Sequence, residues 1–199
     1  MLTPALLAWL AACSDAPRLP RLAPDAVILA FGDSLTYGNG APRSASYPAV
    51  LERLVGRTVI NAGVPGELSS AGSDRLPALL ERHDPDLVIL CHGGNDLLRD
   101  RPPAEIRANL RAMIEHARRH GAAVVLIGVP DKGLWLETAP LYHEVAEAAG
   151  VPLEAETLAR IEGDPGLKAD PIHPNRAGYR RLAQAVAALL RRAGAVESS

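Results

Sequence analysis

The chain has 199 residues, of which 48% are apolar and 4% aromatic, and its formal net charge is −2. This length and apolar content favour one globular domain with a substantial core. The nearly balanced charge, 21 Lys and Arg against 23 Asp and Glu, and the scarcity of aromatic residues argue against a nucleic acid partner.

The first thirteen residues, MLTPALLAWLAAC, form an apolar stretch. Its length is that of the apolar region of a signal peptide, and it is too short to span a bilayer as a helix. The residues from Leu10 to Cys13 resemble the lipobox of bacterial lipoproteins. We therefore expect a lipidated Cys13, a Pro-rich tether over residues 14–25 and a periplasmic, membrane-anchored protein. No Lys or Arg precedes the apolar stretch, so a soluble periplasmic form and an intracellular protein with an apolar N-terminal arm stay open as alternatives.

From residue 26 onward, short apolar runs alternate with amphipathic segments. The runs are apolar on successive residues, as in strands covered on both faces, and they span residues 27–31, 58–61, 87–90, 123–128 and, weakly, 151–154. The amphipathic segments predict helices over residues 47–55, 73–82, 103–120, 139–149 and 175–192. This alternation predicts a parallel sheet with helices on both faces in one domain, residues 26–192, followed by a C-terminal tail, residues 193–199.

Polar, glycine-containing segments follow the first three predicted strands, and they read GDSLTYGNG, NAGVPGE and HGGNDLLRD. A fourth polar segment, DPIHPNRAGY, precedes the last helix. In parallel sheets with helices on both faces, functional groups gather at the carboxyl ends of the strands. We therefore expect these four segments to meet at one edge of the sheet.

Ser34 stands where the first predicted strand passes into a turn. A serine hydroxyl is a poor nucleophile unless a base accepts its proton. His173 is the candidate base, because Pro171 and Pro174 stiffen its loop and Asp170, three residues upstream, can hold the ring. Read alone, Ser34 also fits a turn or helix cap, and Asp170 fits an Asx turn. Together they predict a nucleophile, a base and an orienting carboxylate.

Acyl transfer also needs donors near the oxygen that becomes negative. Gly63, after the second strand, can offer a backbone N–H, because glycine has no Cβ to clash. Asn95, after the third strand, can offer its side-chain amide, and the Ser34 N–H completes the set. The alternatives are that Gly63 only turns the chain and that Asn95 only caps the next segment.

Two residues are candidates for substrate contact. His92 lies three residues before Asn95, and its alternative role is packing near the strand end. Trp135, with Leu136, is a candidate for lining an acyl groove, and the alternative is packing on the sheet. Such residues set specificity by the shape of the site.

Other polar residues fit structural roles. Asp33 and Asp96 are predicted to organise their own turns by accepting hydrogen bonds from backbone amides. Asn175 is predicted to be the N-cap of the last helix, and Cys91 a small buried hydrophobe. Residues 37–39 either shape the substrate entrance or close the turn.

Taken together, these motifs make the chain resemble the GDSL esterase/lipase family of the SGNH-hydrolase superfamily. Four family blocks occur in order, across roughly residues 27 to 191: Gly32-Asp33-Ser34-Leu35, Gly63, Gly94-Asn95-Asp96 and Asp170-x-x-His173. The resemblance implies a three-layer α/β/α, flavodoxin-like sandwich with a central parallel five-stranded sheet. It also implies that Ser34 is the nucleophile, Gly63 and Asn95 are oxyanion donors, His173 is the base with Asp170 as its partner, and no metal or organic cofactor takes part.

The GGND and DPIHPN segments look closest to the bacterial branch of multifunctional thioesterases, lysophospholipases and arylesterases, although Cys91-His92 and residues 131–137 depart from it. We therefore expect hydrolysis of small-molecule carboxylic esters or thioesters through an acyl-serine intermediate. One alternative is deacetylation of cell-wall or polysaccharide sugars by the same residues. Another is a non-catalytic, membrane-tethered binding lipoprotein, because a fold does not by itself imply a function.

Overall fold

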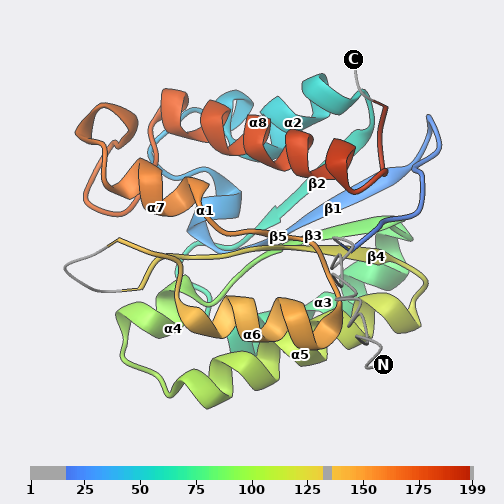
Figure 1. The fold of residues 1–199 in the computed structure, drawn as a ribbon, viewed down its shortest axis with the longest axis horizontal. Helices are drawn as coiled ribbons and strands as arrows, with labels where there is room; N and C mark the ends of the chain where they lie inside the picture. Colours follow the sequence, from blue (N-terminus) through green and yellow to red (C-terminus); the bar gives the residue numbers. More distant parts are fainter. Residues whose placement is uncertain (1–16, 132–135, 198–199) are drawn as a thin grey trace, which may run out of the picture.

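The computed structural model describes residues 17–131 and 136–197. Within them, five parallel strands form a sheet in the order β2-β1-β3-β4-β5, between two layers of helices (Figure 1). The strands are β1 (Val27–Gly32), β2 (Thr58–Gly63), β3 (Leu87–Cys91), β4 (Ala123–Ile127) and β5 (Leu153–Glu154). The predicted α/β/α fold class is confirmed.

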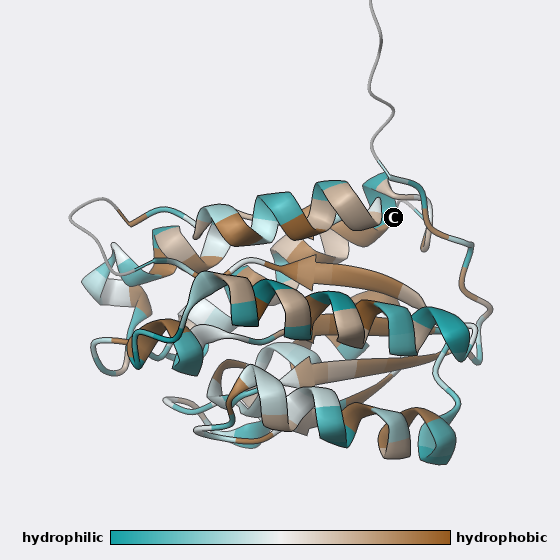
Figure 2. Cartoon of the chain, turned by 90° about the horizontal axis from the view of Figure 1, so that it is seen from below, coloured by the Kyte–Doolittle hydropathy of each residue, from teal (hydrophilic) through white to brown (hydrophobic). Residues whose placement is uncertain are grey.

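The central strands are apolar on successive residues because helices cover both of their faces. Ile28, Leu29 and Phe31 of β1 are completely buried, and every residue of β3 is buried. The outer strand β2 differs, since its first residue, Thr58, is exposed. Figure 2 shows the apolar strands enclosed by helices that carry hydrophilic residues outside. The core therefore lies on both sides of the sheet.

Two groups of helices form the outer layers (Figure 1). One face carries α1 (Ser34–Tyr37), α2 (Tyr47–Val55), α7 (Thr157–Glu162) and α8 (Arg176–Arg192). The other carries α3 (Ser69–His83), α4 (Gly94–Leu98), α5 (Pro103–Arg119) and α6 (Pro140–Ala149). Two 3-10 turns, Arg43–Ala45 and Pro165–Leu167, join elements of the first face. The short helices α1, α4 and α7 escaped prediction because they contain too few turns to show a helical period.

The start of α3 lies before the predicted residue 73, at Ser69. The Asp96 carboxylate accepts hydrogen bonds from the backbone N–H of Ser69 (2.8 Å) and from its hydroxyl (2.7 Å). This side chain, which lies far from Ser69 in sequence, satisfies a backbone donor that a helix start leaves free. The prediction that the Asp96 carboxylate has a structural role and accepts from a backbone amide is confirmed, but the amide belongs to the start of α3 and not to the turn of Asp96 itself.

The two ends of the described chain pair with each other. Leu19 N–H donates to Ala193 O and Leu22 N–H to Ala195 O, both at 2.9 Å, and Leu22 and Ala195 are buried. Residues 19–22 of the expected tether (residues 14–25) and residues 193–195 of the expected C-terminal tail (residues 193–199) therefore pack on the domain and on each other. Cys13 lies outside the described residues. In the described part of the chain, the helices are too short or too polar to cross a membrane.

Candidate active site

A cavity of about 470 Å³ lies beyond the carboxyl ends of β1 and β3, and the segments that follow these strands contribute to its lining. The chain passes from β1 to β2 on one side and later adds β3 on the other side of β1, so this is the switch point of the sheet. Ser34 begins α1 directly after β1, and Asn95 lies in α4 after β3. His173 reaches the same cavity from the loop before α8. The prediction that these segments meet at one edge of the sheet is confirmed for these three residues.

Ser34, His173 and Asp170 form one chain of hydrogen bonds. Ser34 Oγ lies 3.0 Å from His173 Nε2, and His173 Nδ1 lies 2.7 Å from Asp170 Oδ2. The other carboxylate oxygen, Asp170 Oδ1, accepts from the backbone N–H groups of Ile172 (2.9 Å) and His173 (2.8 Å). Asp170 therefore forms the Asx turn that was one alternative and contacts the imidazole at the same time.

The charge on Asp170 determines which nitrogen of His173 carries the proton. Burial acts to raise the pKa of Asp170, but the hydrogen bonds from His173 and from the Ile172 amide outweigh it and lower the pKa to about 2. An ionised carboxylate can only accept, so Nδ1 carries the proton. Nε2 then presents its lone pair to the Ser34 hydroxyl, which is the arrangement that general-base catalysis needs.

The loop that carries His173 is held by backbone and side-chain bonds. Ala169 N–H donates to His173 O at 2.9 Å. Asn175 Oδ1 accepts from the backbone N–H groups of Ala177 (2.9 Å) and Gly178 (3.1 Å), and its Nδ2 donates back to Gly166 O at 2.9 Å. The prediction that Asn175 is an N-cap is confirmed, and the same amide fixes the preceding loop.

The segment after Ser34 both closes a turn and lines the cavity. Gly38 ends α1 in a left-handed conformation with φ of +103°, and Asn39 lines the cavity. At Gly40, φ is +90° and an added Cβ would lie 2.5 Å from Pro174 O. Glycine is needed at this position, because any side chain would push this turn away from the loop that carries His173.

Asp33 links the ends of β1 and β3. Its Oδ1 accepts from the Leu35 N–H (3.0 Å), which confirms the predicted role in the turn, and its Oδ2 accepts from Asn95 Nδ2 (3.2 Å). Burial raises the pKa of Asp33, although His92 and the Leu35 N–H act in the opposite direction. This carboxyl group therefore fixes the position of Asn95 relative to Ser34.

The expected backbone donor Gly63 does not line the cavity. Its N–H donates to Asn61 Oδ1 (3.1 Å), and an added Cβ would overlap the backbone of Tyr37, so Gly63 packs beneath α1. Gly66 lines the cavity instead, together with Ser34, and its φ is +79°. The assignment of Gly63 is therefore wrong in position. The second glycine of the same NAGVPGE segment was the signal in the sequence.

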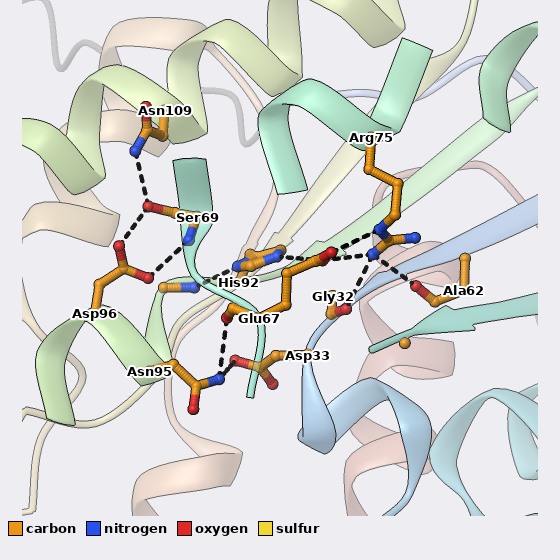
Figure 3. Close-up of polar contacts among 12 residues, drawn as sticks. Gly32, Asp33, Ala62, Glu67, Ser69, Arg75, His92, Asn95, Asp96 and Asn109 are labelled. Atoms are coloured by element: carbon orange, nitrogen blue, oxygen red, sulfur yellow. Dashed lines mark hydrogen bonds and ion pairs between the residues drawn. The ribbon is translucent and has the colours of Figure 1, made fainter. Parts of the chain in front are cut away.

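Asn95 lies in the cavity wall, as predicted, but its amide is already engaged. Nδ2 donates to Asp33 Oδ2 (3.2 Å) and to the backbone oxygen of Glu67 (3.1 Å). Figure 3 shows this amide between the two acceptors. The amide therefore holds the 64–68 loop, which contains Gly66, against the turn of Ser34.

His92 is completely buried, and it does not line the cavity. Its Nδ1 accepts from the Gly93 N–H (3.0 Å), and its Nε2 lies 3.1 Å from Glu67 Oε2. An added Cβ at Gly72 would overlap the ring, so α3 packs directly on it. The prediction that His92 contacts substrate is therefore wrong, and the alternative of packing near the strand end holds.

Sequence reasoning missed the Glu67 cluster, which consists of Glu67, Arg75 and His92 (Figure 3). Arg75 donates to both carboxylate oxygens of Glu67 (2.8 and 2.6 Å) and to Ala62 O (3.1 Å), and its guanidinium stacks 4.3 Å from the centre of the Phe31 ring. Burial acts to raise the pKa of Glu67, but His92 and Arg75 lower it to about 2. The cluster joins the Gly66 loop to the ends of three strands.

The remaining predicted residues have simpler outcomes. Cys91 is completely buried and burial raises the pKa of its thiol, so the prediction of a small buried hydrophobe is confirmed. Trp135 lies outside the described residues. Its neighbour Leu136 lines the cavity, where apolar side chains also include Leu35, Leu97 and Ile172. The cavity therefore offers an apolar surface beside the reactive groups.

A parallel three-layer α/β/α fold with a serine, a histidine and an aspartate in series defines a class of serine hydrolases. Residues 30–181 match the GDSL-like Lipase/Acylhydrolase family. The chain is 34% identical over 190 residues to Esterase TesA of Pseudomonas aeruginosa, with 89% of this chain and 94% of that protein covered. It is 33% identical over 157 residues to Thioesterase 1/protease 1/lysophospholipase L1 of Escherichia coli, covering 75% and 76%.

Solved structures agree with these matches. The crystal structure of TesA superimposes with a TM-score of 0.76 at 32% identity, covering 84% of this chain and 99% of that one. AlinE4, an SGNH-hydrolase family esterase, superimposes with a TM-score of 0.67 at 34% identity, covering 85% and 96%. The chain therefore belongs to the GDSL-like lipase/acylhydrolase family, and it is a carboxylic ester hydrolase.

Proposed function

We propose that the protein hydrolyses carboxylic esters and thioesters through an acyl-Ser34 intermediate, with His173 as base and acid and Asp170 as the group that orients His173. One observation carries this proposal. Ser34 Oγ, His173 Nε2 and His173 Nδ1 lie in series with Asp170, with contacts of 3.0 and 2.7 Å, and Ser34 and His173 line a cavity of about 470 Å³.

In the first half of the reaction, Ser34 Oγ attacks the carbonyl carbon of the substrate while His173 Nε2 takes the hydroxyl proton. The Asp170 carboxylate stabilises the imidazolium that forms. When the tetrahedral intermediate collapses, the bond to the leaving alcohol or thiol breaks and Nε2 returns the proton to it. The acyl group stays on Ser34.

In the second half, a water molecule replaces the leaving group. His173 Nε2 takes a proton from this water, and the resulting oxygen attacks the acyl carbon. Collapse of the second intermediate breaks the bond to Ser34 Oγ, which regains its proton from His173. The free acid leaves, and the enzyme returns to its starting state.

The oxygen that becomes negative requires donors fixed in advance. We assign the backbone N–H groups of Ser34 and Gly66 and the amide of Asn95, because all three residues line the cavity. The Asn95 amide contacts Asp33 at 3.2 Å and Glu67 O at 3.1 Å. For Asn95 to donate to the substrate oxygen, one of these two contacts opens when the substrate binds.

The chemistry of the cavity supports an acyl chain as the bound group. Leu97, Leu98 and Val129 lie in its wall, and apolar contact there removes chain surface from water. The relatives are named as esterase, arylesterase and thioesterase/lysophospholipase. These names support both oxygen and sulfur esters as substrates of this chain.

A substrate panel tests the proposal. It contains p-nitrophenyl esters of rising chain length, palmitoyl-CoA, a lysophospholipid and acetylated xylan. We expect turnover of acyl esters and of the thioester, with acetylated xylan the poorest substrate. Activity on acetylated xylan with none on acyl chains would replace this proposal by a sugar deacetylase.

We also propose that Cys13 carries a lipid that anchors the protein on the periplasmic side of a membrane. The support is the sequence from Leu10 to Cys13, which resembles a lipobox. In a bacterial host, Cys13→Ala is expected to move the protein from the membrane fraction to the soluble fraction. Unchanged partitioning of the variant would contradict the anchor.

A further inference from the structure

The active-site cavity holds a carboxyl group that the proposed mechanism does not use. Glu162, the last residue of α7, lines the same cavity as Ser34 and His173. Leu136 and Ile172 are among the apolar residues beside it in the cavity wall. In the described part of the chain, the Glu162 carboxylate has no hydrogen-bond or ion-pair partner. Glu162 is half-buried, so a ligand that contacts its carboxylate would offset the cost of its partial desolvation.

The charged groups around Glu162 are few. Burial raises its pKa to about 7, and the positive charge of Lys168, which follows the turn packed against α7, acts in the opposite direction. The other titratable groups of the cavity are Asp33, Asp131 and His173. Asp33 is already engaged by Leu35 and Asn95, so it does not compete for a ligand. Glu162 therefore changes between a neutral acid and a carboxylate near neutral pH.

We propose that Glu162 is a specificity-determining residue that binds a positively charged group on the substrate, so that ammonium-bearing esters are favoured over apolar esters of equal shape. A cation entering the cavity gives the carboxylate the hydrogen-bond or ion-pair partner that residues 17–131 and 136–197 do not supply. A charge-assisted contact in a partly desolvated site discriminates more strongly than the same contact in water. This inference rests on the proposed hydrolase function and names a substrate class for it.

Isosteric substrate pairs test the proposal. In one pair the acyl part differs: p-nitrophenyl 4-(trimethylammonio)butanoate against p-nitrophenyl 5,5-dimethylhexanoate. In the other pair the alcohol differs: choline butyrate against 3,3-dimethylbutyl butyrate. The measured quantity is the ratio of kcat/KM within each pair, cationic over neutral. Both members use the same Ser34 and His173, so the titration of His173 cancels in the ratio.

In the unmodified protein, the ratio in at least one pair is expected to rise by about 10-fold as the pH increases through 7 and Glu162 ionises. In Glu162→Gln the ratio is expected to become independent of pH and to stay near the value that the unmodified protein shows well below pH 7. The control is Glu156→Gln, because Glu156 is exposed and paired with Arg160 outside the cavity. This control is expected to keep the ratio and its pH dependence.

The outcomes separate the two proposals. If the ratio of kcat/KM does not change with pH in either pair and is the same in Glu162→Gln, the role of Glu162 is overturned. Ester hydrolysis is then left intact. No turnover of any of these esters would instead contradict the proposed hydrolase function. The pH dependence in the unmodified protein needs no variant, so the test stands even if Glu162→Gln folds poorly.

Discussion

Two carboxylate–histidine pairs belong to the segments at the carboxyl edge of the sheet, and they differ in what the second ring nitrogen contacts. In the Asp170–His173 pair, Nε2 faces Ser34 Oγ in an open cavity. In the Glu67–His92 pair, the ring is completely buried and its Nδ1 is occupied by the Gly93 N–H. In both pairs, hydrogen bonds lower the pKa of the carboxylate to about 2.

The difference shows that a histidine beside a carboxylate is not by itself a catalytic base. His173 keeps one nitrogen free for the proton of the nucleophile, and the side chain of Asp170 stays partly exposed. His92 uses both nitrogens inside the protein, together with Arg75, to fix the Gly66 loop. In the proposed mechanism the first pair performs the chemistry, and the second pair holds the Gly66 loop in place.

Replacing each of the two histidines separately tests this comparison, and the substitution of His173 has the largest expected effect. His173→Ala is expected to lower kcat by about 10⁴-fold or more, because the base is lost, with little change in stability. His92→Gln keeps a side-chain donor and is expected to change kcat by less than about 10-fold while lowering the free energy of unfolding. Steady-state kinetics and thermal unfolding of both variants give the comparison. Equal losses of kcat would show that the two pairs are not distinct.

Substitution of Asp170, the carboxylate that orients His173, is expected to cause the second-largest loss of kcat. Asp170→Asn removes the acceptor that fixes the imidazole tautomer, so kcat is expected to fall by about 10² to 10⁴-fold. Because the Asp170 side chain is partly exposed and its main contacts are local, the melting temperature is expected to change little. A kcat within a factor of about three of the parent would exclude the orienting role.

Substitutions in the Glu67 cluster are expected to lower the free energy of unfolding more than they lower kcat. Glu67→Gln breaks a largely buried ion pair with Arg75 and is expected to cost about 2 to 4 kcal/mol of unfolding free energy. The pKa of Glu67 is lowered from an ordinary value of 4.5 to about 2. Its ionised form therefore stabilises the folded protein fully above pH 4.5, and this contribution is lost as the pH falls to 2.

Melting curves across this pH range provide the check. The gap in melting temperature between the parent and Glu67→Gln is expected to be largest above pH 4.5 and to close as the pH approaches 2. A gap that stays constant over this window would mean that the Glu67 charge does not contribute to stability.

The smallest expected effect concerns Gly66, and Gly56 is a matched control. Both have positive φ, +79° and +61°, with open space where a Cβ would stand. Alanine at either position is expected to cost about 1 kcal/mol of stability. Only Gly66→Ala is expected to lower kcat, by about 3 to 10-fold, because only Gly66 lines the cavity. Equal kcat values in the two variants would argue against Gly66 as an oxyanion donor.

The sheet, the long helices and the three residues proposed to carry the chemistry could be predicted from the sequence, because hydrophobic period and turn chemistry are local signals. Val27–Gly32 is apolar on successive residues, and Asp170 and His173 lie within one short turn. The rest depends on contacts between distant segments. Gly63 and Gly66 are two glycines of the same segment, and the sequence does not tell them apart. Only the contact of Gly63 with the Tyr37 backbone shows that Gly63 packs under α1.

The same reason explains the missed Glu67 cluster and the helix start at Ser69. Glu67, Arg75 and His92 come from a loop, a helix and a strand end, and Asp96 reaches Ser69 from a different helix. Neither contact leaves a pattern along the chain. The environment of Glu162 is a third case, because its burial depends on how α7 closes the cavity.

Covalent labelling with a fluorophosphonate probe tests the central claim, that Ser34 is the nucleophile, most directly. The probe forms a bond to an activated serine oxygen, so the parent protein is expected to be labelled and Ser34→Ala is expected to show no label. Ser46→Ala, which removes another buried serine outside the cavity, is the control and is expected to keep the label. Label that survives in Ser34→Ala would place the nucleophile on another residue, and no label on the parent protein would contradict covalent serine catalysis.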